Sequence, residues 1–126
     1  MPREDFDRNL KQVQDDVVQL SSMVEMAIYK SVDALKRRDL ILSKQIIDED
    51  DVIDKAQQSI ENICIDLIAL ESPIAGDLRA IIAAMMVASE LERMGDYAEG
   101  IAKISLSMGD VAPLKPLIDI PRMMDR

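Results

Sequence analysis

Apolar side chains recur at alternating steps of four and three residues along the first third of the chain. The stripe consists of Phe6, Leu10, Val13, Val17, Leu20, Val24 and Ala27. Val32 and Leu35 prolong it with a small drift. This spacing is typical of an amphipathic α-helix that buries one face. It predicts a first helix from about Glu4 to about Arg38, which is roughly 50 Å long at the α-helical rise.

A second stripe with the same spacing follows a short turn. Its members are Ile46, Asp50, Ile53, Gln57, Ile60, Cys64 and Leu67. Asp39 stands just before this segment and is the expected N-cap, because its carboxylate can accept a hydrogen bond from a free backbone N–H. The second helix is expected to end at Glu71-Ser72-Pro73, since a residue before proline is pushed out of the α region.

A third helix is expected after a short bend at residues 73–76, with Asp77 as its N-cap. Its expected apolar face consists of Leu78, Ile81, Met85, Ala88, Leu91, Met94, Ala98 and Ile101. The helix is expected to end near Met108-Gly109, where glycine is the usual residue after a helix. Gly95 lies mid-helix, where it costs roughly 1 kcal/mol relative to alanine, and this predicts close approach of a neighbouring helix or a bound ion.

Three long helices joined by short turns predict an all-α fold, an antiparallel up-down-up three-helix bundle. This unit is expected to span residues 1–109. Residues 110–126 contain three of the five prolines and then become apolar again. They are expected to form a linker and the truncated start of a second unit.

Composition and net charge limit the classes of function that are compatible with this chain. Apolar residues make up 48% of the 126 residues but aromatic residues only 2%, so the core must be aliphatic. The net charge of −9 argues against nucleic-acid binding, which depends on Lys and Arg neutralising phosphates, and against attraction to anionic membranes. It favours cations and basic protein surfaces as partners. No signal peptide or membrane span is recognised, so a cytoplasmic location is expected, and the single Cys64 is expected to be a buried apolar residue.

Carboxylates gather at one level of the predicted bundle. Glu92 and Asp96 lie one helical turn apart and therefore share a face. Counting equal distances from the Pro73 turn places Asp54 level with Glu92, and Asp50 level with Asp96. The same counting brings Glu25 of the first helix near this level, and Glu99 follows Asp96 by three positions. The candidate metal ligands are therefore Asp50, Asp54, Glu92, Asp96, Glu99 and Glu25.

Oxygen-only ligands select hard cations, namely Mg²⁺, Ca²⁺, Mn²⁺ or ferric iron. The chain contains no histidine, which excludes the usual Cys/His zinc sites and the di-iron Glu-x-x-His motif. One alternative is an ordinary solvated acidic face, partly neutralised by Arg93 and Lys103, on a metal-free helical protein–protein interaction module. An enzyme is not expected, because such a site lacks an obvious general base and the chain lacks a nucleophile–base pair.

The segment Glu90-Leu91-Glu92-Arg93-Met94-Gly95-Asp96-Tyr97-Ala98 resembles the signature of the PhoU family of phosphate transport accessory and regulatory proteins. Asp77-Leu78-Arg79 after Pro73 and Ala75 is similar to the start of the same helix in that family. Val52-Ile53-Asp54 after Asp50 is similar to its second acidic segment. The resemblance covers roughly Phe6 to Met108, although Gly100 stands where the family often has asparagine.

The resemblance implies two similar three-helix units in tandem, with Glu/Asp-x-x-x-Asp motifs that bind metal clusters, iron in some members. These motifs map to Asp50/Asp54 and Glu92/Asp96. The implied partners are the ATPase subunit of a phosphate importer and a sensor histidine kinase, through which phosphate-starvation genes are repressed. The implied position is at most peripheral to the membrane. A single unit would expose the apolar surface that normally meets the second unit, so a homo-oligomer, in the simplest case a homodimer, is expected.

Overall fold

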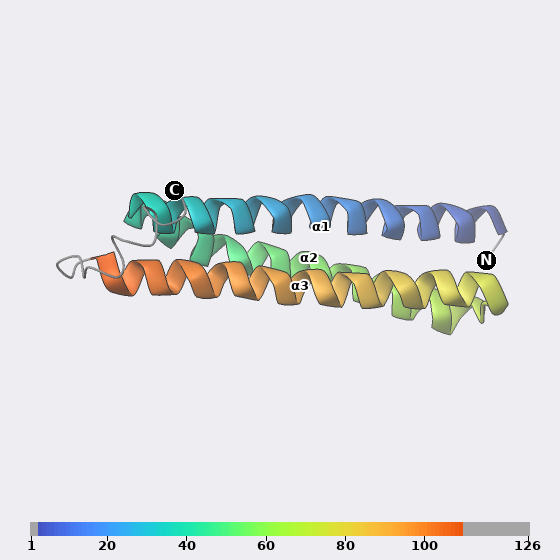
Figure 1. Cartoon of the computed structure of the whole chain (residues 1–126). Helices are drawn as coiled ribbons and strands as arrows, with labels where there is room; N and C mark the ends of the chain where they lie inside the picture. Colours follow the sequence, from blue (N-terminus) through green and yellow to red (C-terminus); the bar gives the residue numbers. More distant parts are fainter. Residues whose placement is uncertain (1–2, 110–126) are drawn as a thin grey trace.

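Three long helices lie side by side in the computed structural model, which describes residues 3–109 (Figure 1). They are α1 (Arg3–Arg37), α2 (Leu40–Glu71) and α3 (Ala75–Gly109). Each helix packs against both of the others, and the short turns make consecutive helices antiparallel. The predicted all-α three-helix bundle is therefore confirmed. The expected linker and second-unit start, residues 110–126, lie outside the described residues.

Both turns are defined by local capping interactions. The Asp39 carboxylate accepts a hydrogen bond from the Leu42 backbone N–H at 3.0 Å, which confirms it as the N-cap of α2. At the other end of α2, Ser72 adopts a left-handed conformation with φ of 44° and its N–H donates to the Ile68 carbonyl at 3.2 Å. Pro73 then follows where the helix has already ended. The two caps fix both ends of α2, and the one at Ser72 sets the level at which side chains of α2 and α3 meet.

The start of α3 differs from the prediction. The helix begins at Ala75, so Asp77 lies in its first turn rather than at the N-cap. The Asp77 carboxylate instead forms an ion pair with Arg3 at 2.5 Å. This contact joins the first turns of α1 and α3, because the N-termini of both helices lie at the same end of the bundle (Figure 1). A carboxylate remains favourable there, since the N-terminal end of a helix carries partial positive charge.

The buried face of α1 follows the predicted stripe at first and then departs from it. Phe6, Val13, Leu20 and Val24 are buried as predicted. The continuation at Val32 is wrong, because Val32 is 39% exposed. Two smaller residues in the same part of α1, Ser31 and Ala34, are buried instead. A straight α-helix drifts by about 20° per seven residues relative to a seven-residue repeat, so the buried face moves to new positions along a long helix.

Small residues form the buried face of α3. They are Ala84, Ala88, Gly95, Ala98, Ala102 and Ser105, joined by Ile81. Met94, predicted to be buried, is 40% exposed. Small side chains let α3 approach its neighbours closely, and near its C-terminal end the Ser43 hydroxyl of α2 donates a buried hydrogen bond to Ser105 at 3.1 Å.

Among the described helices, none combines the length and apolar character needed to cross a membrane.

Candidate metal centre

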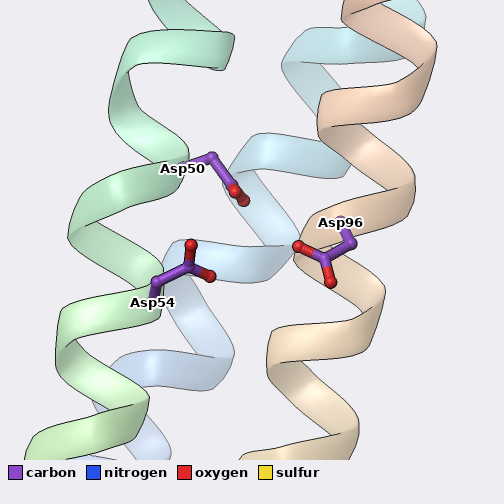
Figure 2. Close-up of side chains that lie close together, drawn as sticks. All are labelled: Asp50, Asp54 and Asp96. Atoms are coloured by element: carbon purple, nitrogen blue, oxygen red, sulfur yellow. The ribbon is translucent and has the colours of Figure 1, made fainter.

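Three carboxylates converge between α2 and α3. Asp50 lies on the buried stripe of α2 and is only 5% exposed. Asp54 is half-buried one turn later, and Asp96 reaches the same gap from α3 (Figure 2). One oxygen atom from each side chain lies within 4.8 Å of the other two. The predicted level match between the acidic pair of α2 and Asp96 is therefore confirmed, and the three carboxylates are close enough to share one cation.

Two oxygen atoms of this cluster are buried and unsatisfied. No group within residues 3–109 forms a hydrogen bond with Asp50 Oδ1 or Asp54 Oδ1, although both atoms are shielded from solvent. A buried acceptor without a partner costs roughly 1–3 kcal/mol, and more when it is charged. A hard cation in the gap would satisfy both atoms, because carboxylate oxygens are its preferred ligands. The donor set and these orphaned atoms therefore fit a metal ion.

The electrostatics of the cluster agree with that fit. Burial raises the pKa of Asp50 from 3.8 to about 7, and the neighbouring carboxylates of Glu99, Asp54 and Asp96 add to the shift. Burial is also the main cause of the raised pKa of Asp54 and of Glu92. Several carboxylates thus crowd one partly desolvated space, where each disfavours the ionised form of the others. The cluster must therefore either hold protons or be compensated by positive charge.

The remaining predicted ligands occupy different surroundings. Glu92 is half-buried and interacts with Asp54, as its effect on the pKa of that residue shows. Glu99 is half-buried beside Asp50 and forms an ion pair with Lys103 at 3.1 Å. The structure places these two side chains at the border of the cluster. Lys103 therefore neutralises part of the acidic face, as the alternative interpretation of the sequence anticipated.

Glu25 and Arg93 lie away from the three converging carboxylates. Glu25 is exposed and lines a groove between α1 and α3 with Ile28 and Leu91. The structure does not bring it to the gap between α2 and α3. Arg93 forms an exposed ion pair with Glu90 at 3.7 Å. Matching residue levels did not reveal these positions, because level alone does not say toward which neighbour a side chain points.

Gly95 explains how α2 and α3 come close enough to form the cluster. A Cβ atom at this position would lie 3.2 Å from Ile53 Cγ2 and 3.6 Å from Asp50 Oδ1. The first distance is tighter than nine in ten real Cβ contacts. The predicted close approach at Gly95 is confirmed, and the neighbour is α2. The glycine therefore sets the separation between the two acidic segments.

A cavity that the sequence did not predict opens beside the cluster, on the side of α1. Its volume is about 320 Å³, and it is lined by Met23, Met26 and Lys30 of α1 together with Asp50 and Gly95. In the sequence, only the position of these methionines and this lysine beside the predicted apolar stripe of α1 could have indicated that they line a cavity. The cavity leaves room for water near the one buried aspartate of the described residues.

Known proteins resemble this chain over most of its length. It is 38% identical over 118 residues to the "Phosphate-specific transport system accessory protein PhoU homolog" of Aquifex aeolicus, covering 94% of this chain and 53% of that protein. A protein of the same description from Clostridium acetobutylicum is 40% identical over 104 residues, or 82% of this chain and 48% of its own length. A third, from Zymomonas mobilis, is 32% identical over 118 residues, with 94% and 50% covered. The chain spans about half the length of the curated relatives it matches.

The family match includes the helices that build the site. Residues 17–105 match the PhoU domain, a range that contains Asp50, Asp54 and Asp96 as well as Gly95. The matched region contains all of α2, most of α3 and the second half of α1, and with them the acidic segments on α2 and α3. The chain therefore belongs to the PhoU family.

Proposed function

We propose that the carboxylates between α2 and α3 bind a hard metal ion. The single observation that carries this proposal is the pair of buried, unsatisfied oxygen atoms of Asp50 and Asp54 opposite Asp96. Glu92 and Glu99 are the proposed additional ligands, with Glu25 the least supported because of its place in a different groove. Mg²⁺, Mn²⁺, Ca²⁺ and ferric iron all suit oxygen ligands, and an iron cluster is the version that the family resemblance implies.

Replacing Asp50 and Asp54 together with Asn tests this proposal. The double variant keeps side-chain size but removes the two charges of α2 that face Asp96. We expect it to lose its bound metal, as measured by elemental analysis after gel filtration. The matched control replaces Asp48 and Asp51 with Asn, because both are exposed acids on α2 that pair with lysines. Unchanged metal content in the Asp50/Asp54 variant, or equal loss in the control, would contradict the assignment.

We further propose that the chain acts in phosphate uptake as a non-catalytic regulatory adaptor. The family membership and the descriptions of the relatives, which name an accessory protein of phosphate-specific transport, support this role. The net charge of −9 suits docking onto basic protein surfaces. The proposed partners are the ATPase subunit of the phosphate importer and a sensor histidine kinase, with the adaptor repressing phosphate-starvation signalling at the cytoplasmic side.

Binding to purified partners separates this role from its alternative. We expect the metal-loaded protein to bind the importer ATPase subunit or the kinase more tightly than the same protein kept in chelator, as measured by biolayer interferometry. The Asp50/Asp54 double variant should behave like the chelated protein. Equal affinity of the loaded and chelated proteins would favour the metal-free interaction module. No binding to either partner would contradict the adaptor role and leave the metal proposal to be judged by the elemental analysis alone.

A further inference from the structure

The cavity beside Asp50 has an exposed mouth and a buried floor. Its volume is about 320 Å³, and residues of α1 and α2 form most of its lining. At the mouth, Met26 of α1 is 56% exposed and Val52 of α2 is 55% exposed. At the floor, Ile46 and Ile53 of α2 belong to the buried core. A ligand could therefore enter between α1 and α2 and reach the interior of the bundle.

Asp50 supplies a polar atom at the floor of this cavity. Its side chain is only 5% exposed, and within residues 3–109 nothing forms a hydrogen bond with its Oδ1 atom. That atom lies close to Gly95, because a Cβ added there would be 3.6 Å from it. Gly95 and Asp50 both line the cavity. The cavity therefore presents an unpartnered acceptor to any molecule that fills it.

The rest of the lining decides which class of molecule fits. Lys30 of α1 and Glu49 of α2 also line the cavity. Both are more exposed than Asp50, and their opposite charges offset each other. The Asp50 carboxylate consequently leaves the cavity with a net negative charge among apolar side chains. Such a site favours a cation with an apolar body and disfavours an anion.

The volume of the cavity limits the size of that cation. An apolar cavity of about 150 Å³ holds one benzene molecule, and the present cavity has about twice that volume. A benzyl or short alkyl group that carries one ammonium group therefore fits. A primary ammonium has three N–H donors, and its hydrogen bonds to a carboxylate are strengthened by charge.

We propose that this cavity binds a small primary amine, with its ammonium group on Asp50 Oδ1 and its apolar body against Met23 and Ile53. The amine supplies both the positive charge and the hydrogen bond that the buried carboxylate lacks. The proposal does not depend on the metal centre, because the cavity is formed by the chain alone. Both ligands would use Asp50, so an amine and a metal ion should compete for this chain.

Benzylamine is a suitable probe for the metal-free chain in EDTA. We expect a dissociation constant on the order of 0.1–1 mM, as befits so small a ligand. In a titration followed by ¹H–¹⁵N NMR, the largest shifts should occur at the amides of Met23, Ala27 and Gly95. Benzyl alcohol has the same body without the charge, and benzoate has the opposite charge. Both should bind at least about tenfold more weakly, and equal binding of benzyl alcohol would overturn the proposal.

Two substitutions test the floor and the mouth of the cavity separately. Asp50→Asn keeps the side-chain size, removes the charge and should weaken benzylamine binding at least about tenfold, whereas Asp48→Asn should not. Val52→Trp obstructs the mouth from an exposed position and should also weaken binding. Its control, Ile65→Trp, changes another exposed apolar residue of α2 and should bind normally. Circular dichroism should show the same helicity in all four variants.

Two results would overturn the proposal at this stage. One is wild-type affinity for benzylamine in both Asp50→Asn and Val52→Trp. The other is binding that appears only after Lys30→Ala, because it would mean that the lysine side chain itself occupies the cavity.

Elemental analysis keeps the amine site separate from the metal centre. Val52 is not a proposed metal ligand, so Val52→Trp should retain metal while it loses benzylamine. Binding of benzylamine by a chain that never retains metal would support the amine site and contradict the metal centre. In protein shown to be loaded with metal, benzylamine should bind at least about tenfold more weakly, because the metal already neutralises Asp50. Unchanged affinity in the loaded protein would overturn the assignment of the ammonium group to Asp50.

Discussion

Asp50 is a carboxylate at a position where the neighbouring stripe residues of α2 are apolar. Ile46 and Ile53, on either side of it in the stripe, are buried core residues. Burial and the nearby carboxylates raise its pKa to about 7, so the folded chain without metal favours the protonated form up to neutral pH. The unfolded chain releases this proton near the ordinary value of 3.8. Folding is therefore linked to proton binding at this residue.

Without metal, we predict that the free energy of unfolding contributed by Asp50 falls as pH rises. Between about pH 4 and pH 7 the folded state binds more protons than the unfolded state, so each step up in pH favours unfolding. The stabilisation is fully present below the unfolded pKa and is lost as pH passes through the folded value of about 7. Urea titrations in EDTA at pH 5, 6, 7 and 8 measure this slope.

Asp50→Asn provides the comparison for that measurement. The amide cannot ionise, so the variant should lose most of the downward slope and should be more stable than the wild type at pH 8. Asp48→Asn, an exposed change on the same helix, should keep the wild-type slope. Parallel pH profiles for the wild type and Asp50→Asn would show that Asp50 is ionised throughout and would contradict the raised pKa.

At the scale of the helices, the sequence predicted boundaries better than faces. The end of α2 at Glu71 and its cap at Asp39 follow from local chemistry, which acts within one turn and needs no tertiary contact. The buried face of α3 was only partly predicted, because that helix has apolar residues on all sides and therefore no strong direction. Small residues such as Gly95 are buried in α3 because α2 approaches closely there. The spacing of apolar residues along one helix does not reveal such an approach.

Gly95 and Gly100, both in the second half of α3, should respond differently to alanine. At Gly100 an added Cβ would meet nothing within 4 Å, so Gly100→Ala should stabilise the helix by about 1 kcal/mol. At Gly95 the same gain is opposed by Ile53, whose Cγ2 would lie only 3.2 Å from the added Cβ. Ile53 is β-branched and has little freedom to move away. Urea unfolding at low protein concentration should therefore rank Gly95→Ala below Gly100→Ala.

Metal content adds a second measurement to this pair. If α2 and α3 move apart to admit the methyl group, Gly95→Ala should also bind metal more weakly, whereas Gly100→Ala should bind it as the wild type does. Equal stabilisation by both substitutions would mean that the contact at Gly95 relaxes without cost, and it would contradict the role assigned to this glycine.

At the scale of the whole molecule, short turns made the convergence of Asp50, Asp54 and Asp96 predictable. Because only residues 72–74 separate α2 from α3 and the helical rise is constant, levels along the two helices could be matched by counting. The same reasoning placed Glu25 near the site, but it lies in the groove between α1 and α3. Counting residues gives the height of a side chain along the bundle. It does not say which neighbouring helix the side chain faces, because that depends on how the three helices pack together.

Metal binding should stabilise the whole bundle, since the proposed ligands lie on two different helices. At a free metal concentration of 100 times the dissociation constant, the gain is about 2.7 kcal/mol. For a domain of this size that raises the melting temperature by roughly 10 °C. The rise should be larger at pH 8 than at pH 6, because the ligands must lose their protons to bind metal. Differential scanning fluorimetry with Mg²⁺, Mn²⁺, Ca²⁺ and ferric iron measures it.

Asp96→Asn is the informative variant for this experiment. Asp96 is exposed, so its replacement should leave the melting temperature in EDTA nearly unchanged while reducing the shift caused by metal. Asp66→Asn, at an exposed position of α2 away from the cluster, should retain the full shift. A metal-induced rise of the same size in Asp96→Asn would show that the cation binds elsewhere.

The buried hydrogen bond between Ser43 and Ser105 has a consequence for the interpretation of natural variants. A slip of one residue between α2 and α3 displaces them by about 1.5 Å, enough to break this bond and to offset Asp50 from Asp96. Ser43 lies two turns from Asp50, and neither hydroxyl belongs to the acidic cluster. A genetic screen for loss of the proposed cation binding should therefore also recover changes at these two serines. Catalogues of deleterious alleles in this family should thus include positions remote from the acidic motif.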